Sequence, residues 1–136
     1  MIYVAFFLFL ALPILGNAQA VKLTDKQINE SGVNQLNFID SLSEATDLAR
    51  LDIANKLPFL ILKGGVSPVV YTTDAKFQGD FNIYFYDLGC TGTLDKYAIE
   101  YNRVIFEYLT SVFGKKWIRI VRKDVIGLTA YKHNKL

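Results

Sequence analysis

The sequence has almost none of the residues that build metal centres and disulfide frameworks. It contains one cysteine, Cys90, and one histidine, His133. A lone cysteine cannot form a disulfide within its own chain, and one cysteine with one histidine falls short of a typical zinc ligand set. We therefore expect no metal site, no cofactor and no internal disulfide.

Net charge is also low, because 15 Lys and Arg residues face 13 Asp and Glu residues. The resulting net charge of +2 is too small to indicate an electrostatic footprint for nucleic acid. We expect no nucleic-acid partner.

Charged side chains are absent from residues 1–20, which are apolar from Ile2 to Leu15 and end with the small residues Ala18 and Ala20. This pattern is typical of a cleaved secretory signal peptide, and the apolar stretch is shorter than the about 20 residues that a membrane-spanning helix needs. We expect cleavage after Ala20, a secreted or periplasmic location, and no transmembrane span thereafter. The alternative is that the segment stays as an uncleaved anchor.

The chain after residue 20 is long enough for one small domain and too short for two. Residues 21–40 predict a weakly structured segment or a short helix, since Thr24 and Gln27 have the spacing of a capping box. We expect one domain over residues 41–128 and a C-terminal tail over residues 129–136.

Helical patterns open and close this domain. Ser41 and Glu44 form a capping box before apolar residues at helical spacing, and Pro58 ends that helix. Apolar residues then recur every three or four positions from 94 to 112, which predicts a long buried helix broken by Gly114. A second amphipathic helix is expected over residues 115–126.

Three segments between the helices favour strands. The apolar run 59–62 and the β-forming run 69–73 flank a Gly-Gly turn, which indicates a hairpin. Residues 74–79 predict a turn or a single helical turn, and residues 81–88 form the strongest strand pattern. The predicted fold class is α+β, with a three-stranded antiparallel sheet packed against two to four helices.

Short motifs from residue 64 onward carry a resemblance. They are Gly64-Gly65-Val66-Ser67-Pro68-Val69, Tyr86-Asp87-Leu88-Gly89-Cys90, Tyr101-Asn102 with Phe106 and Leu109, Gly114-Lys115-Lys116-Trp117, and Arg122-Lys123-Asp124-Val125-Ile126-Gly127-Leu128. Over about residues 40–128 the chain resembles a group of small secreted bacterial proteins of unknown function. The resemblance implies that these segments share one domain and that the region before Ser41 varies, and it implies no activity.

Cys90 is the obvious candidate for a nucleophile, because it follows a strand in a glycine-flanked loop. A thiol nucleophile needs a base to generate the thiolate, and His133 lies near the end of the chain. A packed or turn-forming cysteine is therefore the favoured interpretation, and we predict no catalytic residue.

Basic residues cluster in the last predicted helix, where Lys115, Lys116, Arg119, Arg122 and Lys123 lie within nine residues. An ordinary solvated helix face explains such a cluster, with basic side chains favoured near a helix C-terminus. The functional alternative is a patch for an anionic surface such as lipid headgroups, cell-wall polymer or an acidic protein. Asp124 is expected to form a local ion pair or a cap rather than to act as a catalytic acid.

Tyr84 and Tyr86 lie on one face of the third predicted strand, which leads to Asp87 and the Cys90 loop. They form an exposed aromatic strip if helices cover only the opposite face, and they belong to the core if helices cover both faces.

The combined pattern favours a secreted, non-enzymatic binding module with a protein or an anionic envelope component as partner. Its surface would come from the third strand, the Cys90 loop and the basic helix, with candidate binding residues Tyr84, Tyr86, Asp87, Cys90, Arg119, Arg122 and Lys123. The alternative is a small hydrolase with an acid-based site, whose residues the sequence spacing does not locate.

Overall fold

The computed structural model describes residues 22–89 and 95–135. The predicted signal peptide and Cys90 lie outside these residues. The helices are α1 (Asp25–Asn29), α2 (Gly32–Gln35), α3 (Leu42–Ala54), α4 (Asp74–Phe81), α5 (Asp95–Phe113) and α6 (Leu128–Lys135), with 3-10 helices η1 (Leu36–Phe38) and η2 (Lys116–Arg119). The strands are β1 (Phe59–Leu62) and β2 (Tyr84–Asp87).

The sheet differs from the expected one. The fold is α+β and mostly helical, but within the described residues the sheet has two strands, and β1 pairs with β2 in parallel from Phe59 opposite Tyr84 to Leu62 opposite Asp87. The prediction of a three-stranded antiparallel sheet was therefore wrong. Residues 69–73 form no strand, and the only further pairing in the described chain is an antiparallel bridge between Leu62 and Val125.

The parallel pairing follows from how β1 is buried. All four residues of β1 are buried, which is typical of a strand covered on both faces. Parallel strands cannot be joined by a tight turn, so the chain crosses over through residues 63–83, which contain α4. Gly64 and Gly89, which follow the two strands, lie close together. A Cβ atom on Gly64 would therefore collide with the backbone oxygen of Gly89.

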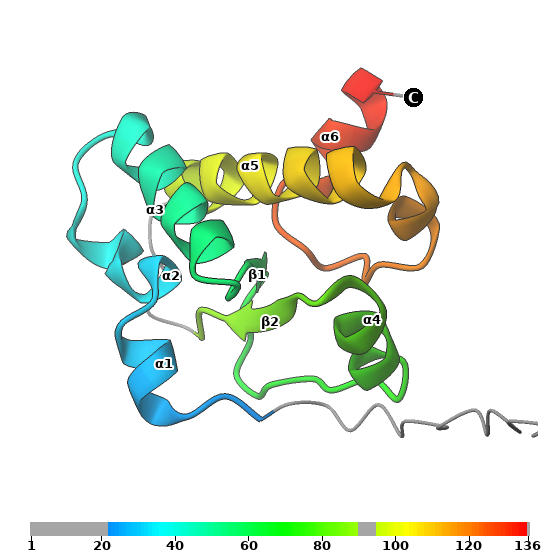
Figure 1. The fold of residues 1–136 in the computed structure, drawn as a ribbon, viewed down its shortest axis with the longest axis horizontal. Coiled ribbons are helices and arrows are strands. Elements are labelled where there is room, and N and C mark those ends of the chain that lie inside the picture. The colour runs from blue at the N-terminus through cyan, green and yellow to red at the C-terminus, as the bar shows by residue number, and fades with distance from the viewer. Residues whose placement is uncertain (1–21, 90–94, 136) are drawn as a thin grey trace, which may run out of the picture.

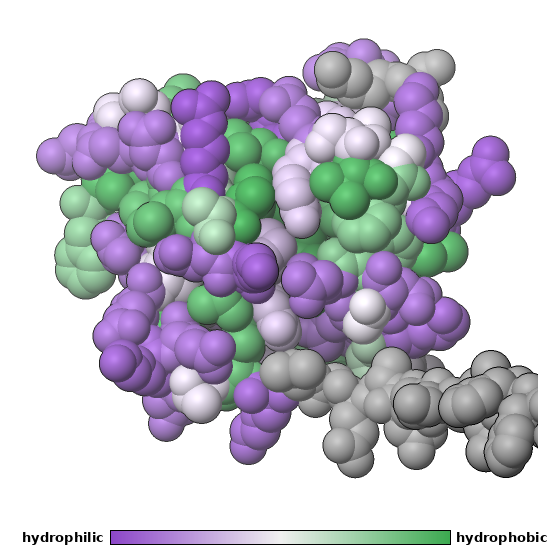
Figure 2. Space-filling model, in the orientation of Figure 1, coloured by the Kyte–Doolittle hydropathy of each residue, from purple (hydrophilic) through white to green (hydrophobic). Residues whose placement is uncertain are grey.

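Helices lie on both sides of this sheet (Figure 1). The helix α5 packs on β1 and α3 packs along α5, while α4 lies on the other side of β2. The ring of Phe77 on α4 stacks on that of Phe85 in β2 at 5.4 Å. Hydrophobic residues of the face shown in Figure 2 gather over the layer of α3 and α5, with hydrophilic residues around them.

A fully buried amide holds α5 to the sheet. Asn102 donates from Nδ2 to the carbonyl oxygens of Ile61 and Ile126, both at 2.9 Å, and its Oδ1 accepts from the Ile61 N–H at 2.9 Å. A buried polar side chain costs little only when its hydrogen bonds are made, and Asn102 makes three. It therefore fixes the register of α5 against β1.

The N-terminal segment packs on the domain through a buried carboxylate. Asp52 on α3 accepts from the N–H groups of Gly32 and Val33 at 2.6 and 2.9 Å and from the Tyr101 hydroxyl at 2.6 Å. These bonds cap α2, because the side chain of its own N-cap residue makes no capping bond. Burial outweighs the three hydrogen bonds and raises the pKa of Asp52.

The expected helix over residues 115–126 does not form. Only η2 is helical there, and the chain then runs along the free edge of β1, where the Lys63 N–H donates to the Asp124 carbonyl and the Ile126 N–H to the Ile61 carbonyl. The unpaired edge of a buried strand needs backbone partners, and this segment supplies them. Of the residues expected to form a C-terminal tail, those from 129 to 135 belong to α6, which begins at Leu128.

The helical starts and the long helix were confirmed. Thr24 forms a full capping box with Gln27, and the Ser41 hydroxyl accepts from the Glu44 N–H. The long helix ends at Phe113, and Gly114 follows with a φ of 68°. Among the described helices, none is both long and apolar enough to span a membrane.

Candidate functional site

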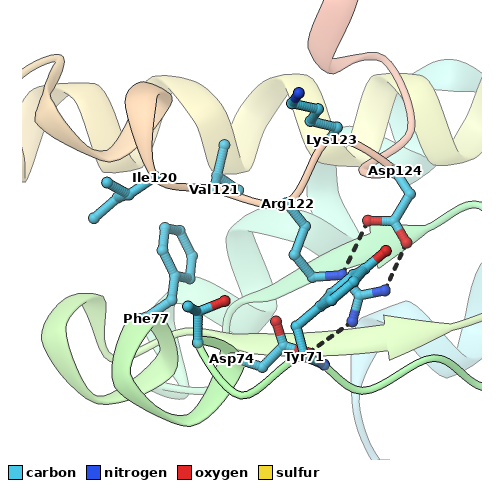
Figure 3. Close-up of a pocket in the computed structure, with 9 residues that line it drawn as sticks. Tyr71, Asp74, Phe77, Ile120, Val121, Arg122, Lys123 and Asp124 are labelled. Carbon is cyan, nitrogen blue, oxygen red and sulfur yellow. Dashed lines mark hydrogen bonds and ion pairs between the residues drawn. The ribbon is translucent and has the colours of Figure 1, made fainter.

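The most heavily bonded charged side chain of the described residues is Arg122, which lies between η2 and the bridge at Val125. Only 6% of its side chain is exposed. Its Nε and Nη2 donate to the two carboxylate oxygens of Asp124 at 2.9 and 2.6 Å. Its Nη1 donates to the Val69 carbonyl and to Asp74 Oδ2, both at 2.8 Å. Figure 3 shows the guanidinium between the two carboxylates.

Two aromatic rings enclose this guanidinium. Its central carbon lies 4.6 Å from the centre of the Tyr71 ring and 5.4 Å from that of Phe85. Cation–π contacts of this kind strengthen when the charge is removed from water. The bonds to Asp124 raise the pKa of Arg122, and the same pair lowers the pKa of the Asp124 carboxyl.

These contacts join segments that are distant in the sequence. Arg122 lies 48 residues after Asp74 and 53 after Val69, and both belong to the crossover between β1 and β2. Asp74 also accepts from the Tyr71 N–H at 2.9 Å. The cluster therefore fastens the middle of the crossover, residues 69–74, to the segment that follows η2.

A pocket of about 370 Å³ opens beside the cluster. Its walls come from the start of α4 and from the segment after η2, namely Tyr71, Thr73, Asp74, Phe77, Ile120, Val121, Arg122, Lys123 and Asp124. Asp74 Oδ2 is fully used by Tyr71 and Arg122, whereas Oδ1 is buried and has no hydrogen-bond partner among the described residues.

The chemistry of the pocket suits binding better than proton transfer. A general acid needs a carboxyl that stays protonated near neutral pH. Both oxygens of Asp124 accept from Arg122, and its pKa is lowered, so it is a poor proton donor. Asp74 Oδ1 is buried, so it is not open to a ligand in the pocket.

Of the predicted basic residues, only Arg122 and Lys123 come to this pocket. Arg122 is buried and ion-paired rather than part of a solvated face, and the expected ion pair of Asp124 is the one with Arg122. Lys123 is exposed, and in Figure 3 its side chain points away from the carboxylates. Arg119 is exposed on η2 and does not line the pocket.

The predicted residues of β2 lie elsewhere. Tyr84 and Tyr86 are half-buried, and both rings contact Phe59, at centroid distances of 5.8 and 6.0 Å. The Tyr86 hydroxyl donates to Asn34 at 3.1 Å, and burial raises its pKa. Asp87 accepts from the nearby Gly89 N–H at 2.8 Å. These contacts favour the core interpretation of the tyrosines over an exposed strip.

Two residues of the site were missed. Asp74 follows Thr72-Thr73 at the start of a helical turn, where a carboxylate is explained by the helix dipole alone. Tyr71 was assigned to a strand on its β-propensity. No local signal connects either of them with Arg122, because the contact spans 48 residues.

The crossover beside the pocket exposes apolar side chains. Val66 is 96% exposed and Val70 82%, and Val69 and Tyr71 are about half exposed. We call residues 66–71 the apolar loop. It is continuous with the pocket, since Tyr71 belongs to both.

Comparisons with protein-family models, curated proteins and solved structures found no match to this chain. The resemblance to small secreted bacterial proteins therefore stays a prediction. Within residues 22–89 and 95–135, no group of three or more His, Cys, Asp and Glu side chains is placed to hold a metal ion.

Proposed function

We propose that this chain is a secreted or periplasmic, non-enzymatic binding protein that docks on a protein partner through the apolar loop. The observation that carries the proposal is the exposure of Val66 and Val70, at 96% and 82%, on a loop that Arg122 holds by a hydrogen bond to the Val69 carbonyl. Contiguous exposed apolar side chains on a small protein are typical of an interaction surface.

The order of the loop supports this function. Arg122 bonds to the Val69 carbonyl in the middle of the loop and to Asp74, which begins α4 three residues after the loop. Tyr71 is held by its own N–H bond to Asp74 and by the stacked guanidinium. A loop that is already ordered loses little conformational entropy on binding, so more of the apolar contact contributes to affinity.

A protein partner fits better than an anionic surface. The expected basic helix does not form, and the charge of Arg122 is neutralised by Asp74 and Asp124. An apolar patch with a polar rim is the usual composition of a protein interface. Residues 1–20 support export, because their pattern is that of a signal peptide.

The alternative of a small hydrolase gains one observation, since Asp74 and Asp124 meet on a single guanidinium. Both carboxylates are held by the same cation, however, and Asp124 is a poor acid for the reason given above. The arrangement gives neither residue a separate acid or base role, which favours binding.

The test is capture from an envelope extract on the immobilised chain from residue 21 onward. A V66S/V70S variant removes the most exposed side chains of the apolar loop. The matched control is Val112→Ser, which removes a 55% exposed valine on α5. We expect one protein to be retained in high salt by the unchanged chain and by the control, and to be lost with V66S/V70S.

Two outcomes contradict the proposal. Equal capture by V66S/V70S and by the control means that the loop is not the interface. A captured partner released by salt alone means that charge rather than apolar contact holds it.

A further inference from the structure

The pocket beside Arg122 has an exposed apolar side chain on each of two walls. Tyr71, at the end of the apolar loop, belongs to one wall and is 50% exposed. Ile120, which directly follows η2, belongs to the other wall and is 57% exposed. Figure 3 shows both walls, one formed by α4 and the residues before it, the other by the segment after η2. The apolar surface of the loop therefore continues across the pocket to Ile120.

Contacts within the chain hold the walls in place. Phe77 is buried on α4, and its ring stacks on that of Phe85 in β2. Tyr71 is fixed by its N–H bond to Asp74 and by the guanidinium of Arg122 over its ring. A pocket that is already formed loses little conformational freedom when a side chain enters it, so more of the contact contributes to affinity.

The chemistry of the walls selects the kind of side chain that fits. Tyr71 and Phe77 provide aromatic rings, and Ile120 adds aliphatic surface. Asp124, whose side chain is 34% exposed, adds a carboxylate. An aliphatic side chain would gain apolar contact alone. An aromatic ring gains the same contact, and its positive edge and negative face also interact with a carboxylate and with neighbouring rings.

We propose that this pocket receives an aromatic side chain of the protein partner that docks on the apolar loop. The inference rests on the proposed function, because the partner that covers Val66 and Val70 brings the ring to the pocket. Residues that anchor a protein interface are commonly aromatic and fill pockets, while the surrounding contacts exclude water. The pocket is then the anchor point of the interface, and the apolar loop is the contact beside it.

The first experiment titrates two probes into the isotope-labelled chain from residue 21 onward and follows the backbone amides by NMR. N-acetylphenylalaninamide carries an aromatic ring, and N-acetylcyclohexylalaninamide carries a saturated six-membered ring on the same backbone. We expect saturable shifts for the aromatic probe at the amides of Phe77, Ile120 and Val121. We expect at least roughly threefold weaker binding of the saturated probe, because it lacks the aromatic contacts.

Ile120→Ser is the decisive variant, because it removes part of one wall and leaves the apolar loop unchanged. The matched control is Val112→Ser, since Val112 is 55% exposed on α5 and does not line the pocket. Shortening an exposed side chain has little effect on folding. We expect Ile120→Ser to bind the aromatic probe at least roughly threefold more weakly, and Val112→Ser to bind it like the unchanged chain.

The titrations give three results that overturn the inference. They are no saturable binding of the aromatic probe, binding of the saturated probe that is as tight, and equal binding of the aromatic probe by Ile120→Ser and Val112→Ser. None of these results depends on the partner, so the proposed function is then decided by capture alone.

Capture from the envelope extract connects the pocket with the partner. We expect Val112→Ser to retain the partner and Ile120→Ser to lose it, and we expect the aromatic probe to elute it more readily than the saturated probe. Retention by Ile120→Ser together with loss in V66S/V70S overturns this inference and leaves docking through the loop intact. Retention by both variants overturns the inference and the proposed function together.

Discussion

Arg122 and Asp74, 48 residues apart, form an ion pair with an Nη1–Oδ2 distance of 2.8 Å. Both side chains are more than nine-tenths buried, so the pair is shielded from solvent and from salt. It is the point where the crossover of the parallel strands meets the segment after η2. The stability of the crossover and the shape of the pocket therefore depend on the same contact.

Replacing Arg122 tests this dependence. Arg122→Leu leaves two carboxylates without their cation, and removing one partner of a buried pair destabilises a protein by about 3 kcal/mol or more. We expect a loss of that size in urea-induced unfolding. Arg119→Leu is the control, because Arg119 is exposed, and it should change stability by less than about 0.5 kcal/mol. Equal losses in the two variants would show that the ion pair contributes nothing.

The dependence of stability on acid follows from Asp124. Its pKa is lowered from an ordinary value of 3.8, chiefly by the hydrogen bonds from Arg122. As the pH falls, Asp124 is protonated in the unfolded chain before it is protonated in the folded chain. Its contribution to stability is therefore complete at pH values above the ordinary pKa, and it is lost as the pH falls through the lowered pKa of the folded chain. We expect the free energy of unfolding to fall less steeply with decreasing pH in Arg122→Leu than in the unchanged chain. Urea unfolding between about pH 5 and pH 2 measures this dependence. Parallel curves would contradict the assignment.

Asn102 offers a test with almost no change of shape. In Asn102→Asp a carboxylate oxygen faces the carbonyl oxygens of Ile61 and Ile126, where Nδ2 donates in the native chain. We expect a loss of about 3 kcal/mol at neutral pH, because a buried charge then lacks its donors. Part of the loss should return in mild acid, where the protonated carboxyl donates once. Asn134→Asp, an exposed site, serves as control and should change stability little.

Gly64 and Gly65 form a matched pair of sites. A Cβ atom on Gly64 meets the backbone of Gly89, which cannot move aside without shifting β2, whereas the nearest atom to a Cβ on Gly65 is 3.8 Å away. We expect Gly64→Ala to destabilise by about 2 kcal/mol and Gly65→Ala to be neutral or slightly stabilising in thermal unfolding. A neutral Gly64→Ala would mean that the two strand ends are not in close contact.

The sequence was sufficient for features that depend on neighbouring residues. The capping residues Thr24 and Ser41 and the break at Gly114 were predicted correctly, because each acts within one helical turn. The sequence was not sufficient for the sheet. Residues 69–73 have high β-propensity, but propensity expresses how well a side chain fits a pleated surface, and no strand is available beside them.

The candidate site was predicted only in part. The residues of the motif Arg122-Lys123-Asp124 were singled out as a basic cluster, and the local ion pair of Asp124 was expected. The basic cluster was placed on a helix because its apolar residues have helical spacing. In the structure the same segment forms backbone hydrogen bonds with the free edge of β1. With the segment in this position, the Arg122 side chain points inward to Asp74. A contact of this kind depends on the packed fold and leaves no periodic signal.

The carboxylate of Asp52 has a practical consequence for the start of the chain. Residues 21–40 have the least regular pattern, yet Gly32 and Val33 give Asp52 two of its three hydrogen bonds, and Val33 and Leu36 are almost fully buried. A shortened chain beginning at Ser41 would keep the acid and lose these donors together with two core side chains. The segment before Ser41 is thus part of the packed domain. A shortened chain should therefore still include Ser31 and the residues that follow it.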